Sequence, residues 1–350
     1  MIQNIAIVSL SSGTIEEPFA AHEVALGVRR LEAYGLNVRF MPHAMKGIDY
    51  VREHPEQRAE DLLAAFRDPE IDMILCAIGG DDTYRLLPWL FEHDELRSAV
   101  SGKVFLGFSD TTLNHLMLHR VGLNTFYGQS FLADVCELDN DMLPYTRRYF
   151  EELLRTGTIA EITPSDVWYE SRTDFGPDQL GVPLHAHRDR GFELLQGSPR
   201  FAGAILGGCI DSLYDCFDGE RYPDMPVLCR KYGLIPTPED WRGKILLLES
   251  SEEQPSPEKY RRALEFLKAA GIFGAVSGVL AGKPMDEMYY DEYKDALVGV
   301  IDDPALPILY NVNIGHALPR CIIPFGVRAE VDAEAQRIHF DGKSGNILRR

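Results

Sequence analysis

The sequence predicts an α/β protein of two domains, the first built on a Rossmann-like parallel sheet. Short apolar runs alternate with helical patterns, which is the order that parallel sheets produce. The 350 residues exceed what one hydrophobic core usually holds. The alternation weakens between Gly157 and Ser198, where prolines and charges accumulate, so we expect a linker with an irregular excursion there.

The first domain, residues 1–160, shows the alternation most clearly. Its expected strands are Ile5–Val8, Asn37–Met41, Met73–Ile78 and Val104–Phe108. Its expected helices are Glu23–Ala33, Gln57–Phe66, Thr83–Phe91 and Met142–Arg155, the last of which closes the domain. Apolar strands separated by amphipathic helices favour a parallel sheet covered by helices.

The second domain, residues 201–350, is predicted to be smaller, and residues 161–200 join the two as a linker and substrate loop. Its expected strands are Lys244–Glu249, Ala275–Leu280 and Pro307–Asn311, with helices at Pro257–Ala270 and Glu287–Ile301. The segment Gly326–Phe340 is expected to form a terminal β-hairpin.

Composition narrows the class of partner. The formal charge of −19 argues against nucleic-acid polymers and anionic membranes, because those partners require basic patches. No apolar run approaches 18 residues, and the amino-terminal residues read as a strand rather than a secretion signal. The six cysteines are scattered without a Cys-x-x-Cys pair, as in reduced intracellular proteins. We therefore expect a cytoplasmic protein that acts on a small molecule.

The histidine spacing does not predict a metal site. The closest pairs are His185 with His187 and His115 with His119, and no zinc motif accompanies them in the sequence. We expect neither a metal nor another cofactor.

Ser109 lies where a β-rich run ends at Gly107-Phe108-Ser109-Asp110 and a helical stretch, expected to be amphipathic, begins at Leu113. A strand, a sharp turn and a helix in this order form a nucleophile elbow, in which the serine hydroxyl stands clear of the sheet. The alternative is that Ser109 only caps the following helix, since serine is a preferred N-cap residue.

A glycine-rich turn, Gly79-Gly80-Asp81-Asp82-Thr83, follows another predicted strand. Its backbone amides could bind an anion. The turn is similar to the Gly-Gly-Asp-Gly-Thr signature of NAD and lipid kinases, but Asp82 replaces the third glycine and adds negative charge near a phosphate. The alternative is that the N–H groups of Gly80 and Asp110 stabilise an oxyanion formed when Ser109 attacks a carbonyl.

Two further candidates lie after strands of the second domain. Glu249 ends an apolar run, and His316 follows the strand at Pro307–Asn311. Ligands gather at the carboxyl ends of parallel strands, so these positions suit a general base and its carboxylate partner. Glu249 could instead be a solvated strand end, and His316 a buried loop histidine bonded to backbone.

Taken together, the segments resemble the LD-carboxypeptidase family of serine peptidases over nearly the whole chain. The matching segments are Gly79-Gly80 with Arg85-Leu86-Leu87-Pro88, Gly107 to Thr112, Gly207 to Leu213, Leu247-Leu248-Glu249, and Gly315-His316 with Pro324-Phe325-Gly326. The resemblance implies that Ser109 is the nucleophile, His316 the general base and Glu249 the residue that orients His316. It also implies a homodimer with the site between its domains.

The segment Ser165 to Glu170 looks like the loop of the microcin C immunity branch of this family, in which a tryptophan stacks on adenine. That branch cleaves the amide between an aminoacyl group and a nucleotide-like moiety, and Trp168 would bind the base. Trp168 could also be a hydrophobic plug. Cys209 departs from the asparagine that many relatives carry, so the pocket could differ in shape or polarity.

The predicted function is therefore serine carboxypeptidase or amidase activity on a peptidyl-nucleotide or small peptide. Acyl transfer to Ser109 and hydrolysis of the acyl-enzyme need no cofactor. One alternative is a muramoyltetrapeptide LD-carboxypeptidase that releases D-alanine from cell-wall tetrapeptides. Another is a cytoplasmic small-ligand binding protein with an inactive triad, because two α/β lobes also occur in proteins that close on a ligand without chemistry.

Overall fold

The computed structural model describes residues 2–341. Residues 1 and 342–350, the outer ends of the two predicted domains, lie outside the described residues. The chain divides into two compact units, each with its own sheet. Of the described residues, the first unit contains 2–158 together with Arg172–Leu184, and the second contains Ile159–Ser171 and residues 185–341.

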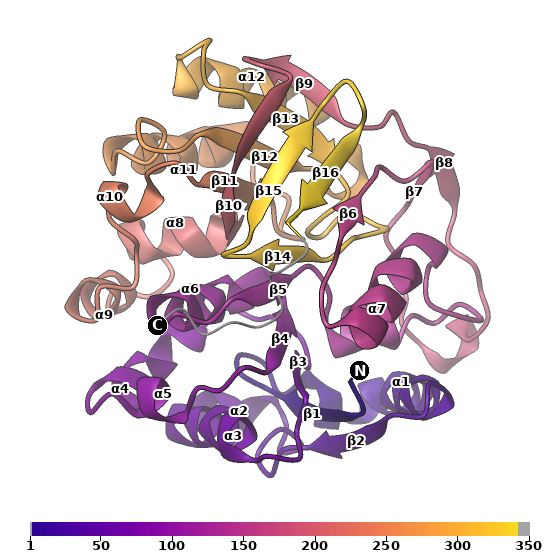
Figure 1. Cartoon of the computed structure of the whole chain (residues 1–350). Helices are drawn as coiled ribbons and strands as arrows, with labels where there is room; N and C mark the ends of the chain where they lie inside the picture. Colours follow the sequence, from indigo (N-terminus) through magenta and orange to yellow (C-terminus); the bar gives the residue numbers. More distant parts are fainter. Residues whose placement is uncertain (1, 342–350) are drawn as a thin grey trace. The chain divides into compact units, whose positions relative to one another are not determined.

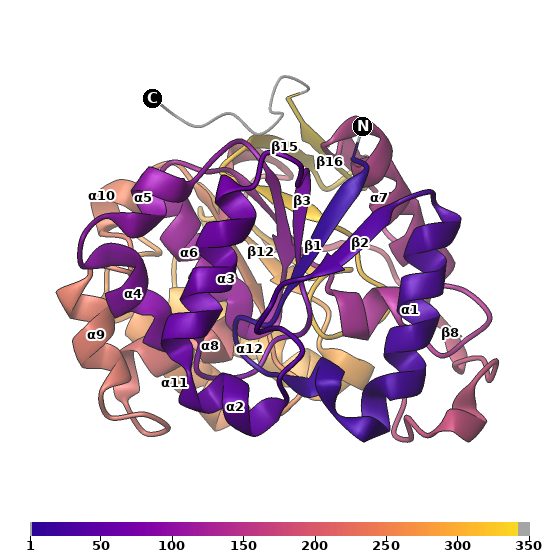
Figure 2. The same cartoon turned by 90° about the horizontal axis from the view of Figure 1, so that it is seen from below.

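The first unit contains a parallel sheet of five short strands. They are β1 (Asn4–Val8), β2 (Asn37–Phe40), β3 (Met73–Cys76), β4 (Val104–Gly107) and β5 (Thr125–Tyr127). The strand order is β5-β4-β3-β1-β2. From β1, the chain adds β2 on one side and β3 to β5 on the other, so the switch point lies between β1 and β3, which are neighbours in Figure 2. In doubly wound sheets ligands bind outside the carboxyl ends of the strands at such a switch point. The segments after β1 and β3 are therefore the first place to look for a site.

Helices follow the strands of the first unit, as the sequence predicts. They are α1 (Ala21–Ala33), α2 (Ile48–Glu53), α3 (Pro55–Arg67), α4 (Leu87–Phe91), α5 (Glu95–Ala99), α6 (Thr112–Arg120) and α7 (Pro144–Thr156). The strands β3 and β4 are buried at every position, so apolar side chains cover both faces of the sheet centre.

The second unit is built on a mixed sheet in which four parallel strands form the centre (Figure 1). These are β10 (Arg200–Cys209), β11 (Ile245–Glu249), β12 (Gly278–Gly282) and β13 (Ile308–Val312). Antiparallel strands extend both edges, with β15 (Arg328–Asp332), β16 (Arg337–Phe340) and β6 (Glu161–Ile162) beyond β10, and β9 (Glu193–Gln196) beyond β13. The strands β15 and β16 are the predicted terminal hairpin.

The remaining elements of the second unit are helices and short strands. The helices are α8 (Ile210–Asp218), α9 (Met225–Lys231), α10 (Pro238–Trp241), α11 (Pro257–Ala269) and α12 (Tyr290–Ile301). The strands are β14 (Ile323–Phe325) and a separate two-stranded ribbon of β7 (Val167–Tyr169) and β8 (Ala186–Arg188). The mixed α/β class with a parallel sheet and a carboxyl-terminal hairpin is thus confirmed.

Three local predictions differ from the structure. The expected helix at Thr83–Phe91 is a 3₁₀ turn, Thr83–Leu86, followed by the short α4, because Pro88 fits only the first turn of a helix. The helix α6 is buried at each position from Thr112 to Leu118 and is not amphipathic. The predicted irregular excursion contains four short strands, β6 to β9, which are too brief for an alternating pattern to show.

Within residues 2–341, no helix combines the length and the apolar character that crossing a membrane would require. All six cysteines are buried and carry free thiols, in line with the scattered spacing.

Candidate active site

Ser109 has the backbone geometry of a nucleophile elbow. The strand β4 ends at Gly107, and Ser109 begins a 3₁₀ turn, Ser109–Thr111, that leads into α6. Its φ of 65° lies in the left-handed region, which costs energy for any residue with a β-carbon and concentrates at functional sites. The residue before the turn is Phe108, so Ser109 does not occupy the N-cap position that the alternative reading gave it. A strained serine between a strand and a helix is an arrangement suited to a nucleophile.

The glycine-rich turn after β3 approaches Ser109 closely. A β-carbon on Gly79 would lie 2.7 Å from the Ser109 hydroxyl oxygen and 3.4 Å from the Asp110 nitrogen. Gly80 has a φ of 150°, and a β-carbon there would lie 2.2 Å from the Ser11 hydroxyl oxygen. Only glycine allows the two loops to pack this tightly. The backbone after β3 is therefore held against the serine, at the switch point of the sheet.

The Asp82 side chain does not project as the sequence analysis assumed. Its carboxylate lies 2.5 Å from Nη1 of Arg58, and both residues are almost fully buried. The same Arg58 nitrogen donates to the carbonyl oxygens of Leu10 and Ser11, each at 3.2 Å. Asp82 thus anchors the segment after β1 through Arg58, and its charge is neutralised inside the unit instead of facing a bound phosphate.

The Asp110 carboxyl group also has a structural role. It accepts hydrogen bonds from the Ser11 hydroxyl, at 2.6 Å, and from the Thr83 N–H, at 2.9 Å. Burial raises the pKa of Asp110 to about 7, although these two bonds lower it. The side chain therefore ties three loops together, and the backbone N–H of Asp110 is the group that adjoins Ser109.

The second unit brings Glu249 and His316 together. Glu249 ends β11 and is 2% exposed, so it is not a solvated strand end. Its Oε2 accepts from Nδ1 of His316 at 2.8 Å and from the His316 backbone N–H at 3.3 Å. Gly315 makes this approach possible, because a β-carbon there would lie 2.3 Å from Oε2. A carboxylate on Nδ1 fixes the imidazole tautomer and leaves Nε2 for proton transfer.

A second carboxylate, not predicted from the sequence, contacts this histidine. Oε2 of Glu252 lies 2.9 Å from Nε2 of His316. Burial lowers the pKa of His316, but the charges and hydrogen bonds of Glu249 and Glu252 outweigh it and raise the pKa to about 10. The bond to His316, in turn, lowers the pKa of Glu252 to about 2 despite partial burial. The three-residue spacing from Glu249 was the available signal, but it does not indicate which way the turn points Glu252.

Cys209 shares the environment of this pair. It ends β10 directly beside Glu249 on β11, and its Sγ lies within 4.8 Å of ligand atoms of both Glu249 and His316. Burial, followed by the charge of Glu249, raises the pKa of the Cys209 thiol well above its ordinary value. The thiol therefore stays protonated at neutral pH and has little nucleophilic character.

Trp168 lies on β7 of the two-stranded ribbon and is 9% exposed. Its indole stacks on the His187 ring with centroids 4.3 Å apart and an angle of 17° between the planes. The Lys283 ammonium lies 5.3 Å from the indole centroid. Both the stacking surface and the hydrophobic plug fit this environment, because the tryptophan is packed yet paired with a flat ring.

Comparison with known proteins places the chain in the peptidase class. Two family models match it, the LD-carboxypeptidase N-terminal domain over residues 5–128 and the LD-carboxypeptidase C-terminal domain over residues 202–331. The chain belongs to the LD-carboxypeptidase family. The predicted family resemblance is therefore confirmed.

Several relatives have been named or solved. An MccF-like protein from Streptococcus pneumoniae, solved in complex with AMP, is 60% identical, with a TM-score of 0.97 over 98% of this chain and 100% of that chain. The microcin C7 self-immunity protein MccF of Escherichia coli is 24% identical, over 81% of this chain and 77% of its own length. A structure of MccF with glutamyl sulfamoyl guanosine has a TM-score of 0.79 at 22% identity, over 99% of this chain and 96% of that chain, and shares the fold.

Proposed function

We propose that the protein is a serine-type carboxypeptidase or amidase in which Ser109 is the nucleophile, His316 the general base and Glu249 the orienting carboxylate. The observation that carries the proposal is the 2.8 Å bond between Glu249 and Nδ1 of His316, which orients the imidazole as a general base requires. Ser109 has the positive φ and the strand–turn–helix position of the serine in a nucleophile elbow.

The proposed reaction is acyl transfer in two halves. Nε2 of His316 takes the Ser109 proton as the oxygen attacks the amide carbonyl, and the backbone N–H groups of Gly80 and Asp110 stabilise the oxyanion. The protonated His316 then gives its proton to the leaving amine as the carbon–nitrogen bond breaks. Water, deprotonated by His316, hydrolyses the acyl-enzyme and restores Ser109. Before the first step Glu252 must leave Nε2 and the imidazolium must release its Nε2 proton to solvent, because only a neutral imidazole can accept the Ser109 proton.

For the substrate we propose an aminoacyl-nucleotide of the microcin C type, with Trp168 binding the base. The support is the family relationship to an AMP-bound MccF-like protein at 60% identity. MccF itself has been solved with aspartyl sulfamoyl adenosine. The indole of Trp168 already stacks on a flat ring in the second unit, and a purine could form a similar contact.

A second candidate is release of D-alanine from cell-wall tetrapeptides. A murein tetrapeptide carboxypeptidase of Pseudomonas aeruginosa is 35% identical over 101 residues, 29% of this chain and 32% of that protein. We further propose that the protein is cytoplasmic, since its six thiols are free and buried, and that it forms the homodimer implied by the family resemblance.

The test uses wild-type protein and the Ser109→Ala variant, with Ser98→Ala as a matched control on the exposed face of α5. Each is incubated with an aminoacyl sulfamoyl-adenosine and, separately, with a tetrapeptide ending in D-alanine, and products are measured by mass. We expect release of the sulfamoyl-adenosine by wild type and Ser98→Ala but not by Ser109→Ala. Release of D-alanine alone would establish the second candidate. If Ser109→Ala retains substantial activity, or if wild type binds but cleaves neither substrate, the proposed mechanism is wrong.

A further inference from the structure

One face of the two-stranded ribbon in the second unit gathers two histidines and a carboxylate. The strands β7 and β8 are antiparallel, with Trp168 opposite His187. Just beyond the ends of both strands, the Glu170 N–H donates to the His185 carbonyl oxygen at 3.0 Å. Alternate residues of a strand share a face, so Trp168 and Glu170 on one strand lie on the same side as His187 and His185 on the other.

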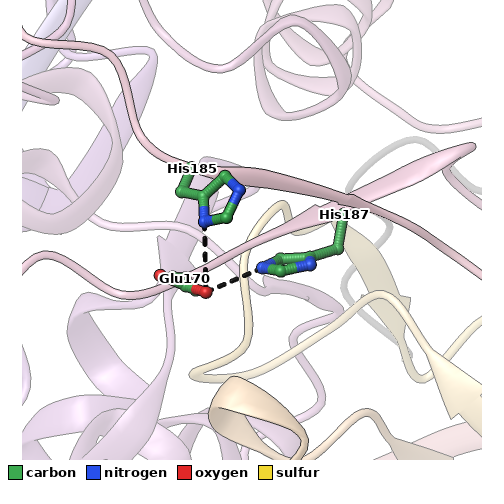
Figure 3. A group of neighbouring side chains, drawn as sticks. All are labelled: Glu170, His185 and His187. Atoms are coloured by element: carbon green, nitrogen blue, oxygen red, sulfur yellow. Dashed lines mark hydrogen bonds and ion pairs between the residues drawn. The ribbon is translucent and has the colours of Figure 1, made fainter.

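The donor atoms of these side chains converge on one point. Nε2 of His187 lies 2.8 Å and Nδ1 of His185 lies 3.2 Å from the same oxygen, Oε1 of Glu170 (Figure 3). The three donor atoms all lie within 4.8 Å of one another. Two ligand atoms on a tetrahedral zinc ion, with bonds of about 2.0 Å, are about 3.3 Å apart. Small side-chain adjustments would therefore let all three donors bind one ion.

We propose that Glu170, His185 and His187 form a binding site for a divalent transition metal ion, and that zinc is the ion that fits the donor set best. Two imidazole nitrogens and one carboxylate oxygen are ligands that zinc accepts, whereas calcium and magnesium require oxygen ligands throughout. Three protein ligands leave a fourth position for water or an anionic group. None of the three residues proposed for acyl transfer is a ligand, but His187 stacks on Trp168, so the site adjoins the residue proposed to bind the base.

The surroundings of the three ligands suit metal binding. His187 is stacked on the Trp168 indole, which restricts the plane of the imidazole. The side chains of His185 and Glu170 are 69% and 51% exposed, so an ion can reach them from solvent. The sequence analysis found no carboxylate near His185 and His187 because Glu170 is separated from them by a long loop.

The location of the site gives the metal a structural consequence. The chain leaves the second unit after Ser171 and returns at His185. Glu170 thus lies just before the chain leaves the second unit, and His185 lies where the chain returns. One ion bound to both would join the two ends of the loop formed by residues 172–184. A two-stranded ribbon is marginally stable by itself. A metal ion that links the ends of both strands lowers the conformational entropy of the state in which the strands are separated. Zinc binding should therefore stabilise the folded protein.

The test is zinc titration of the full chain, without a histidine tag and stripped of metal with a chelator, followed by calorimetry. We expect one zinc ion to bind per chain. His185→Ala and His187→Ala should each weaken binding at least tenfold. His54→Ala is the matched control, because His54 also pairs with a glutamate, Glu56, at 2.9 Å but belongs to no three-donor cluster of the described residues.

Two further measurements guard against a folding artefact. Glu170→Gln keeps the side-chain shape and should weaken zinc binding with unchanged circular dichroism. Substitution of cobalt should give the visible spectrum of a four-coordinate ion in wild type and lose it in His187→Ala. The proposal is overturned if zinc does not bind, or if binding survives all three substitutions. The second outcome would place the ion elsewhere, with the cluster of Cys209, Glu249 and His316 as the next candidate.

Discussion

Replacing Glu252 with glutamine should shift the pH dependence of activity. Glu252 holds one of two negative charges against His316, 2.9 Å from Nε2, and its side chain is 62% exposed. At that separation a pair of unit charges interacts by about 1.4 kcal/mol in water and about 6 kcal/mol at an effective dielectric constant of 20. Because Glu252 is largely exposed, the screened value applies, which corresponds to about one pH unit.

The sign follows from the role proposed for His316. A general base is active when neutral, so activity rises with pH through the pKa of the imidazole. Glu252 raises that pKa, and Glu252→Gln lowers it. We therefore expect the acid limb of the kcat/KM profile to move to lower pH by about one unit.

The assay is kcat/KM for an aminoacyl sulfamoyl-adenosine across the pH range in which the protein stays folded. Direct NMR titration of the His316 ring provides a readout that does not depend on turnover. Glu253→Gln is the matched control, because Glu253 is the next residue in the chain but forms its ion pairs with Arg221 and Lys259. An acid limb that stays in place, or moves upward, in Glu252→Gln would refute the reasoning.

The remaining predictions concern the Glu249–His316 pair and the buried Arg58–Asp82 ion pair. Glu249→Gln should lower kcat by about 10²–10⁴-fold with little change in substrate binding, measured by calorimetry, because the imidazole loses its orienting charge. Gly315→Ala should lower both kcat and the melting temperature, since its φ is 86° and the added methyl would overlap the Glu249 carboxylate. Arg58→Met should lower the free energy of unfolding in urea by about 3 kcal/mol, because among the described residues Asp82 would keep an ion pair with Arg85 alone, at 3.6 Å. A loss below about 1 kcal/mol would contradict that account.

The sequence predicted the parts of the site that strand ends determine. Ser109 and Glu249 each follow an apolar run, and the carboxyl ends of parallel strands are where ligands gather, so their positions could be inferred without coordinates. His316 follows β13 in the same way, and the structure confirms its contact with Glu249. Periodicity indicated where the buried strands end, whereas the pairing of Glu249 with His316 was predicted from the family resemblance.

Side-chain direction within turns could not be predicted in this way. Asp82 points inward to Arg58, and Glu252 folds back onto His316, although both belong to polar segments that the sequence presents as open loops. Contacts across long loops were equally hidden, as with Glu170 and the two histidines of β8. In each case a partner distant in the chain decides the orientation, and one sequence does not record that partner.

Glu249 and Glu252 bind opposite nitrogens of the His316 imidazole and should have opposite effects on its use as a base. A carboxylate on Nδ1 increases the basicity of Nε2 and can remain in place throughout the reaction. A carboxylate on Nε2 occupies the atom that accepts the Ser109 proton in the proposed mechanism, so it raises the pKa of His316 and would block the proposed base. Removing Glu249 should therefore reduce kcat at every pH, whereas removing Glu252 should free the base and extend activity to lower pH. Kinetics of the two glutamine variants measured side by side would separate a carboxylate that orients the histidine from one that masks it.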